Sequence, residues 1–399
     1  MNKQKIFNII SLVIIITSFI VYMIRFIYFY KLEHNNYVES NLLVDKVKEN
    51  SKDNLYNNYL KGDVENNYVY YSNQYFRILK IEDKKIVLVT DDIISSLIYG
   101  NSNYKQSYVY NYLNDYYSTL NTDYLTKTKL CLSDRKSLND NCEELVEENI
   151  GLLSYFDYKM AGANKSYLNI GKYFWTLTKS KDNKVWYIFD EGGISDTNFE
   201  NKAYGIRPVI TLKEDTLYKS GTGTKNDPYI IENEFKIGVG SYIKYSNKLF
   251  RIISVLDDGY IISSVDSIKN IFSYTTNKFK KVDYNSAYYY LNNVYYYELD
   301  NSLILENNWY IGEYTSNYKE IYNEYVSAKV GMVNVSDFFS LDTLTLTPSQ
   351  EMIIYKTKEG ILKKYDINES LNIKPTIKIS KDFNTSGSGT IDDPYEVLK

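Results

Sequence analysis

Histidine is almost absent from this chain. His34 is the only one among 399 residues, which excludes Ser-His-Asp and Cys-His catalysis and nearly every zinc site. Two cysteines are too few for a disulfide-dense scaffold, and 44% hydrophobic with 24% charged residues excludes wholesale disorder. The formal net charge of -4 provides no basic field, so we expect no nucleic-acid partner. We also expect no cofactor and no bound metal.

Tyrosine, in contrast, is abundant, with 45 residues. Tyrosine supplies rigid contact area to binding surfaces at low entropic cost, so its excess could indicate a binding protein. The enrichment is not confined to one region, however, and asparagine and lysine are abundant as well. AT-rich codon usage therefore explains the excess better than a binding surface does.

The N-terminal region contains a long apolar run. Residues Ile6 to Ile24 carry no charge, and Arg25 ends the run. A helix of this length spans roughly 28 Å, close to the thickness of a bilayer core, and no small-residue cleavage site follows it. We therefore predict a transmembrane signal anchor within residues 1–30. It would hold a single-pass protein in the cell membrane with its C-terminal region extracellular; the alternative is a buried core helix.

Cys131 and Cys142 are the only cysteines, and they lie close together in a polar stretch typical of a loop. A disulfide between them would remove unfolded-state entropy worth roughly 3 kcal/mol in an oxidising compartment. We predict this disulfide, which agrees with an extracellular location. The alternative is two reduced thiols.

Four sequence blocks occur twice, in the same order. The first, Tyr68 to Leu79, recurs at Tyr242 to Ile253 and shares the string Tyr-Ser-Asn-x-x-Phe-Arg-Ile. The other pairs are Tyr110–Tyr117 with Tyr288–Tyr295, Tyr204–Lys213 with Leu371–Ser380, and Ser220–Tyr229 with Ser386–Tyr395. Repetition of this kind indicates two copies of one module.

These blocks divide the chain after its anchor into three parts. We predict a polar stalk at 31–61, a first module at 62–234 and a second, degenerate module at 235–399. Each module opens with an alternating hairpin, continues with a short helix near Val109–Leu120 or Asn285–Leu299, and closes with a strand. Strands at both ends with a helix between them indicate an α+β fold.

A family resemblance rests on three segments of the first module. Trp175–Thr178, Val185–Ile194 and Tyr204–Val209 resemble the order W-x-x-(S/T), A/V-W-Y-V, G-(V/I/F)-R-P-V. That order is similar to uncharacterised DUF6273-like surface modules of low-GC bacteria, with a C-type lectin-like fold shared with formylglycine-generating enzymes. The resemblance implies two tandem C-type lectin-like modules of antiparallel sheet plus short helices. No cysteine follows Cys142, so the activity of those enzymes is not implied.

The candidate ligand-binding residues are Trp175, Trp186, Tyr187 and Arg207. The tryptophans suit stacking on a sugar or peptide, although core packing under the loops explains them better. Arg207 suits a ligand contact or a buried arginine that bonds loop carbonyls, while Arg77 and Arg251 recur at one hairpin position and are interpreted as framework. Oxygens at Asn226–Pro228 suit calcium, but an Asx-Pro turn explains that stretch better.

These features together predict a non-catalytic, membrane-anchored extracellular surface protein that binds a glycan, peptide or protein ligand. We predict no catalytic residue. Two alternatives stay open: a carboxylate-based hydrolase at the cell surface, which needs two facing acids about 5 to 9 Å apart, and a structural component of a surface complex.

Overall fold

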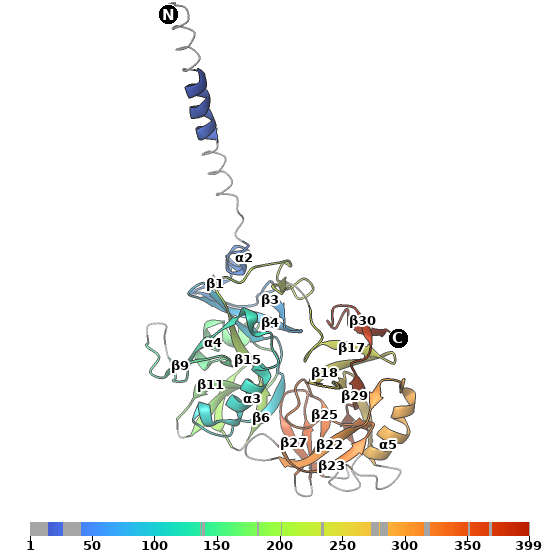
Figure 1. The fold of residues 1–399 in the computed structure, drawn as a ribbon. Helices are drawn as coiled ribbons and strands as arrows, with labels where there is room; N and C mark the ends of the chain where they lie inside the picture. The colour runs from blue at the N-terminus through green and yellow to red at the C-terminus, as the bar shows by residue number, and fades with distance from the viewer. Residues whose placement is uncertain are drawn as a thin grey trace, which may run out of the picture.

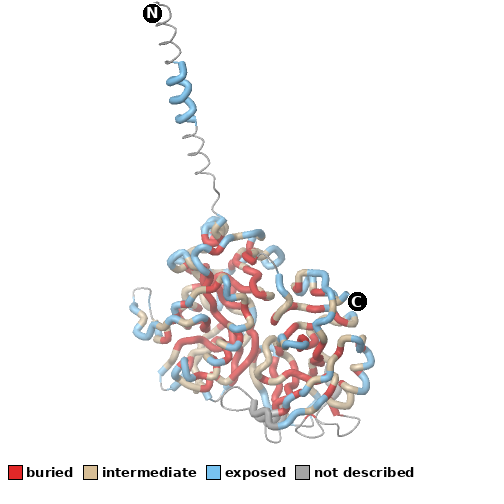
Figure 2. The backbone as a smooth tube through the Cα atoms, in the orientation of Figure 1, coloured by how far each residue is buried: buried red, intermediate tan, exposed pale blue. Residues whose placement is uncertain are grey.

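A computed structural model describes residues 15–26 and 41–398, except 136, 138–139, 182, 201, 233–234, 273–278, 280–285, 315–319, 350–351 and 367–368. The described chain beyond residue 41 folds into two β-rich units (Figures 1 and 2). One core lies mainly in the first unit but also contains Val335 and Ile354 of the second, and another core lies within the second unit. Sheets dominate both units, and the α-helices there are short. The longest, α3, has ten residues.

The first unit contains α2 (Leu43–Asn50), β1 (Leu55–Tyr56), β2 (Tyr59–Leu60), β3 (Tyr68–Tyr71), β4 (Gln74–Glu82), β5 (Lys85–Thr90), β6 (Ser95–Ile98), η1 (Tyr104–Gln106), α3 (Tyr108–Tyr117), η2 (Thr122–Tyr124), β7 (Leu125–Thr126), β8 (Thr128–Cys131), β9 (Leu145–Glu148), β10 (Gly151–Leu152), α4 (Tyr155–Met160), η3 (Ala163–Lys165), β11 (Phe174–Lys179), β12 (Lys184–Ile188), β13 (Ile194–Asn198), β14 (Ala203–Ile206), β15 (Pro208–Leu212) and β16 (Tyr229–Ile230).

The second unit contains β17 (Tyr242–Tyr245), β18 (Lys248–Leu256), β19 (Gly259–Ser264), β20 (Ile268–Phe272), α5 (Ala287–Asn293), η4 (Tyr295–Glu298), β21 (Ile304–Leu305), β22 (Asn307–Tyr314), β23 (Glu320–Ala328), β24 (Val330–Gly331), β25 (Thr343–Ser349), β26 (Met352–Lys356), β27 (Leu362–Asp366), β28 (Leu371–Ile373), β29 (Thr376–Ser380), β30 (Asn384–Ser386) and β31 (Tyr395–Leu398).

The principal sheets of the two units pair their strands in the same way. The path β16-β3-β4-β5-β15 in the first unit has the counterpart β31-β17-β18-β19-β29 in the second. In both paths the outermost pair is parallel and the other pairs are antiparallel. The β4–β5 hairpin expected from the sequence is confirmed. Asp83 and Lys84 at its tip have positive φ values, as two-residue hairpin turns require.

The predicted fold class is wrong in its balance of helix and strand: the structure is a multi-sheet, β-rich fold rather than an α+β fold of lectin-like modules. The helices α4 and α5 have only six and seven residues. Segments around the cysteine loop, which suggested a loop in the sequence, pair as the β8–β9 hairpin. Polar alternation on an exposed hairpin gives little periodic signal, and this explains the error.

The predicted transmembrane helix is not supported either. Residues 6–14 of the predicted span lie outside the described residues, and residues 15–26 are helical. No helix among the described residues is both long and apolar enough to span a membrane. The sequence hydropathy alone had suggested the single-pass anchor.

The segment predicted as a stalk is folded from residue 42 onward. Leu43, Val44 and Val47 of α2 are buried in the first core, because this face of the helix is apolar. β2 pairs with β4, and the Tyr59 hydroxyl donates to the Asp157 carboxylate at 2.6 Å. Residues 42–60 therefore belong to the first unit. The mostly polar composition of this segment led to the stalk prediction, although one face of α2 is apolar and buried.

Cys131 and Cys142 form a disulfide at the end of the β8–β9 hairpin. The bond closes a short loop, so its main effect is to restrict the unfolded chain. We expect the double change Cys131→Ser and Cys142→Ser to lower the free energy of unfolding by roughly 3 kcal/mol. Urea unfolding of the wild type with and without reductant provides the control. An unchanged midpoint after reduction would contradict this account.

The two units are joined by buried polar contacts. Lys356, at the end of β26, is fully buried, and its ammonium donates to Ser95 Oγ of the first unit at 2.6 Å. The same ammonium donates to Ser340 Oγ at 2.7 Å and to the Val335 carbonyl at 2.9 Å. Backbone bonds from Phe339 to Ile94 and from Tyr173 to Glu359 also cross the boundary.

Candidate functional site

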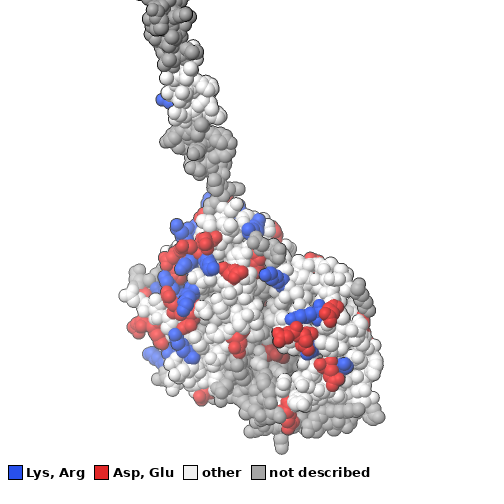
Figure 3. All heavy atoms as spheres, in the orientation of Figure 1, with Lys and Arg blue, Asp and Glu red and all other residues white. Residues whose placement is uncertain are grey.

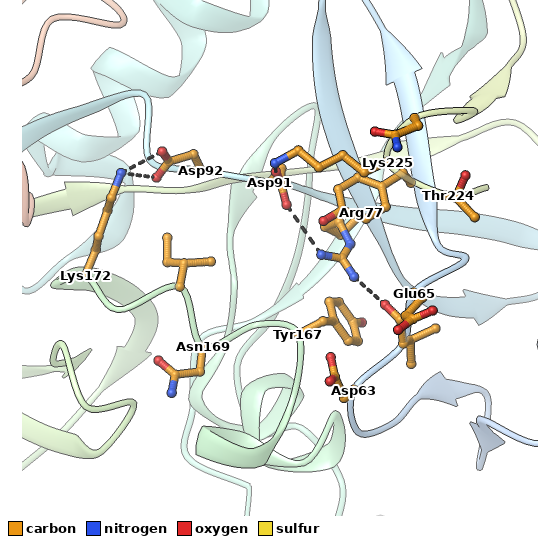
Figure 4. Close-up of a pocket in the computed structure, with 14 residues that line it drawn as sticks. Asp63, Glu65, Arg77, Asp91, Asp92, Tyr167, Asn169, Lys172, Thr224 and Lys225 are labelled. Atoms are coloured by element: carbon orange, nitrogen blue, oxygen red, sulfur yellow. Dashed lines mark hydrogen bonds and ion pairs between the residues drawn. The ribbon is translucent and has the colours of Figure 1, made fainter.

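A hollow of about 590 Å³ opens at one end of the first sheet (Figure 4). Its walls come from segments far apart in the chain: the approach to β3, the middle of β4, the residues just after β5, the loop before β11 and the loop before β16. Polar and charged side chains dominate its lining, including Asp63, Glu65, Arg77, Asp91 and Lys172. The hollow therefore suits a polar ligand rather than an apolar one.

Arg77 forms the floor of this hollow. Its Nε donates to Asn67 Oδ1 and its Nη2 to the Val64 carbonyl, both at 2.5 Å. The guanidinium also stacks over the rings of Tyr68 and Tyr167, at 3.8 and 4.7 Å from their centroids. With its hydrogen bonds and both faces engaged, Arg77 is held in one orientation.

Two acidic residues after β5 are held by cations. Asp91 accepts from Arg77 Nη1 at 3.5 Å, and Lys225 Nζ lies 4.0 Å from its other oxygen. Lys172 Nζ contacts both oxygens of Asp92, at 2.7 and 2.6 Å (Figure 4). These pairs fix the wall between the β5 end and the loop before β11, because each carboxylate is shared between separate segments.

Asp63 and Glu65 lie at the rim and differ from the other carboxylates of the hollow. Both are exposed, and neither forms an ion pair with a described residue. Over the face drawn in Figure 3, acidic and basic side chains are interspersed rather than separated into large patches. Asp63 and Glu65 are therefore local acidic groups on a surface of mixed charge.

Arg207 lies beneath the hollow and does not line it. It is fully buried, and it donates to the carbonyls of Thr90 at 2.8 Å, Leu168 at 2.7 Å and Asp91 at 3.3 Å. Burial lowers the pKa of Arg207 to about 10, although Asp91 and Asp92 oppose this shift. Arg207 thus ties the β5 end to the loop before β11, and these are two walls of the hollow.

The other three predicted ligand-binding residues lie on β11 and β12, outside the lining of this hollow. Trp175 is fully buried, and its Nε1 donates to the Leu97 carbonyl at 2.8 Å. Trp186 stacks on Tyr155 with ring centroids 4.9 Å apart. Tyr187 stacks on Tyr204 at 4.4 Å. The structure therefore does not bring the four predicted residues together in one site.

Most residues of the hollow gave no signal in the sequence. Asp91, Asp92 and Lys172 occur in no motif; the recurring blocks with Arg77 and with Ser220–Tyr229 were the only signals from this region. The recurrence of Arg77 at Arg251 supported a framework role, which the buried hydrogen bonds of Arg77 also show. The separation of the wall segments along the chain explains why the site was missed.

The turn at Asn226–Pro228 acts as a connector. Asp227 Oδ2 accepts from the Thr222 backbone at 2.9 Å, and Asp393 Oδ2 accepts from Ser388 at 2.8 Å in the second unit. The carboxylates thus close backbone turns. Within the described part of the chain, no group of three or more His, Cys, Asp or Glu residues is placed to hold a metal ion.

Comparison with known proteins supports one part of the family resemblance. Residues 83–214 match the family described as "Domain of unknown function (DUF6273)". The match begins in the β4–β5 turn and ends just after β15, within the first unit. Searches of curated proteins and of solved structures returned no match.

Proposed function

We propose that this chain is a non-catalytic binding protein that acts outside the cell, and that the hollow of the first unit holds part of a glycan or peptide. The observation that carries this proposal is the pre-arranged wall of the hollow. Arg77, Asp91, Asp92 and Lys172 are fixed by their mutual contacts before any ligand arrives. Pre-arrangement of this kind reduces the entropy that binding costs.

The chemistry of the rim favours a ligand with amino and hydroxyl groups. Asp63 and Glu65 are exposed carboxylates without an ion pair among the described residues, so a ligand ammonium finds acceptors there. Asn169 and Thr224 add neutral polar groups to the lining. A glycan that contains amino sugars, or a peptide with a lysine side chain, fits this set.

The disulfide supports the extracellular part of the proposal. Bonds such as Cys131–Cys142 persist in oxidising compartments and are rare where thiols are kept reduced. The shared strand path supports a further part, namely that the two units arose by tandem duplication. Both hairpins, β4–β5 and β18–β19, also shift register at the same point of the recurring sequence.

A carboxylate-based hydrolase fits the hollow less well. Two facing acids would have to be available for proton transfer and nucleophilic attack. Asp91 and Asp92 are instead held in ion pairs with Arg77 and Lys172. A purely structural component would not require a polar hollow with pre-arranged walls.

The proposal predicts the effect of a double change at the rim. We expect Asp63→Asn with Glu65→Gln to weaken binding about tenfold or more, because hydrogen bonds to charged groups are the strong ones. The purified chain would be screened on glycan and peptide arrays, and the dissociation constant of a positive ligand measured by calorimetry. Glu200→Gln, an exposed change outside the hollow, is the matched control. Absence of any retained ligand, or equal binding by the double variant, would refute the proposal.

A further inference from the structure

A second hollow, of about 310 Å³, lies between the two units. One wall comes from the first unit and includes Asp91, Asp92 and Lys225, which also line the first hollow. The opposite wall comes from the second unit and includes Tyr242, Arg251 and Lys374. The two hollows are therefore neighbours that share one set of residues.

The second-unit wall contains residues that correspond to residues in and beneath the first hollow. Tyr242 and Arg251 occupy the strand positions of Tyr68 and Arg77: Tyr242 pairs with Arg251 in its hairpin, as Tyr68 pairs with Arg77. Lys374 follows the second-unit strand β28 where Arg207 follows β14, in the recurring sequence block. Two positions that line the first hollow, and one that lies beneath it, thus recur in the wall of the second hollow, with a different side chain at the third.

The first difference removes a negative charge. After β5 the backbone N–H of Asp91 donates to the Tyr75 carbonyl at 3.0 Å; at the same place after β19, Val265 donates to Leu249 at 3.0 Å. Arg77 therefore has Asp91 as its carboxylate partner, whereas the corresponding position in the second unit is Val265, which carries no charge. Among the described residues, Arg251 forms no ion pair.

Arg251 is nevertheless held in place. Its Nε donates to the Gly240 carbonyl at 3.1 Å, and its guanidinium stacks over Phe339 at 3.6 Å and Tyr242 at 4.9 Å. No described group accepts from its two Nη atoms. A positioned guanidinium with open donors suits bidentate recognition of a planar or tetrahedral anion.

The second difference concerns the cation at the position of Arg207. Arg207 donates hydrogen bonds to three carbonyls. Lys374, at the corresponding position of the second unit, has an ammonium that forms no hydrogen bond or ion pair with a described residue. Burial lowers the pKa of Lys374, and Arg251 adds to this effect while Asp342 and Asp266 oppose it. Asp342 itself accepts from Tyr355 at 2.6 Å and from Asn372 at 3.3 Å.

The acidic residues of the opposite wall are already neutralised. Asp91 is paired with Arg77, and Asp92 is paired with Lys172. The second hollow therefore contains two cations, Arg251 and Lys374, that form no ion pair with a described residue. Phe339, Leu341 and Ile391 add apolar surface beside them.

We propose that the second hollow binds an anionic group, a carboxylate or a phosphate monoester, carried on an apolar or aromatic body. Arg251 and Lys374 hold the anion, and the apolar lining holds the body. This site differs from the amine-favouring rim of the first hollow, and it does not depend on the ligand of that hollow.

The inference is tested with small probes on the full chain. We expect saturable binding of phenyl phosphate, benzoate or both in ligand-observed NMR titrations, with no saturable binding of neutral benzyl alcohol. The tighter of the two anions identifies the preferred group. Equal binding of benzyl alcohol, or no saturable binding of either anion, would overturn the proposal.

Two variants test whether the anion binds in the second hollow. Lys374→Gln should weaken the preferred anion about tenfold, because it removes one of two charged donors. Val265→Asp should weaken it at least as much, because it supplies in the second unit the carboxylate that Asp91 supplies in the first. Lys244→Gln changes a lysine that pairs with Glu396 outside this hollow and is the control.

Melting curves check that each variant folds; if Val265→Asp fails to fold, Lys374→Gln decides alone. The rim variant Asp63→Asn with Glu65→Gln should retain anion binding even though it loses the first ligand. Unchanged anion binding by folded Lys374→Gln, or loss of anion binding in the rim variant, would show that the anion is bound elsewhere and would overturn the assignment.

Discussion

Replacing Arg207 with methionine should lower the free energy of unfolding by about 3 to 5 kcal/mol and loosen the first hollow. Arg207 is fully buried and bonds the carbonyls of Thr90, Leu168 and Asp91. Methionine fills much of the same space but donates no hydrogen bond, so three acceptors would lose a charged donor. Chemical denaturation followed by tryptophan fluorescence measures the change.

Two further variants separate the hydrogen bonds of Arg207 from its charge. Arg207→Lys keeps the charge but loses the branched donor, so it should recover only part of the lost stability. Lys219→Met, an exposed change, controls for the removal of a cation. Full stability of Arg207→Met would contradict the proposed role of Arg207 in tying two walls together. Hydrogen exchange should rise near Thr90 and Leu168 before the rest of the unit opens.

Replacing Lys356 with methionine should cost about 2 to 4 kcal/mol and weaken the contact between the units. The buried ammonium bonds Ser95 of the first unit and Val335 and Ser340 of the second. Methionine would leave these polar groups without that donor in a buried region. Calorimetry should then show two separated transitions, because most of each core lies within one unit.

Lys363→Met, on the exposed face of β27, provides the matched control for Lys356. It removes the same charge without a buried hydrogen-bond network and should leave the melting profile unchanged. A single, unshifted transition for Lys356→Met would show that apolar packing alone, including Phe338 against Tyr112 and Tyr116, holds the units together.

Local features were predictable from sequence wherever neighbouring residues decide them. The β4–β5 hairpin follows from alternating apolar residues around a polar turn, and the recurring Tyr-Leu-Asn block predicted helices close to α3 and α5. Ser107 and Ser286 accept from backbone N–H groups as N-caps at equivalent helix starts. These features depend on contacts over a few residues, which a short window of sequence contains.

Features that combine distant segments were not predictable in the same way. The helix α2 has a polar composition, and only its packing on the first sheet shows that residues 42–60 are not a stalk. From the sequence, Arg207 could be a ligand contact or a buried arginine that bonds carbonyls. In the structure it is fully buried and donates to the Leu168 carbonyl. Neither outcome is encoded by local periodicity.

The sequence by itself determined the opening hairpin of each unit, the closeness of Cys131 to Cys142 and the recurrence of one pattern in two places. Only the tertiary structure decided that both hollows lie side by side and share Asp91 and Asp92. The physical reason is that pairing and burial act between residues far apart in the chain. The difference between Asp91 and Val265 matters chemically because the fold places Arg77 next to Asp91.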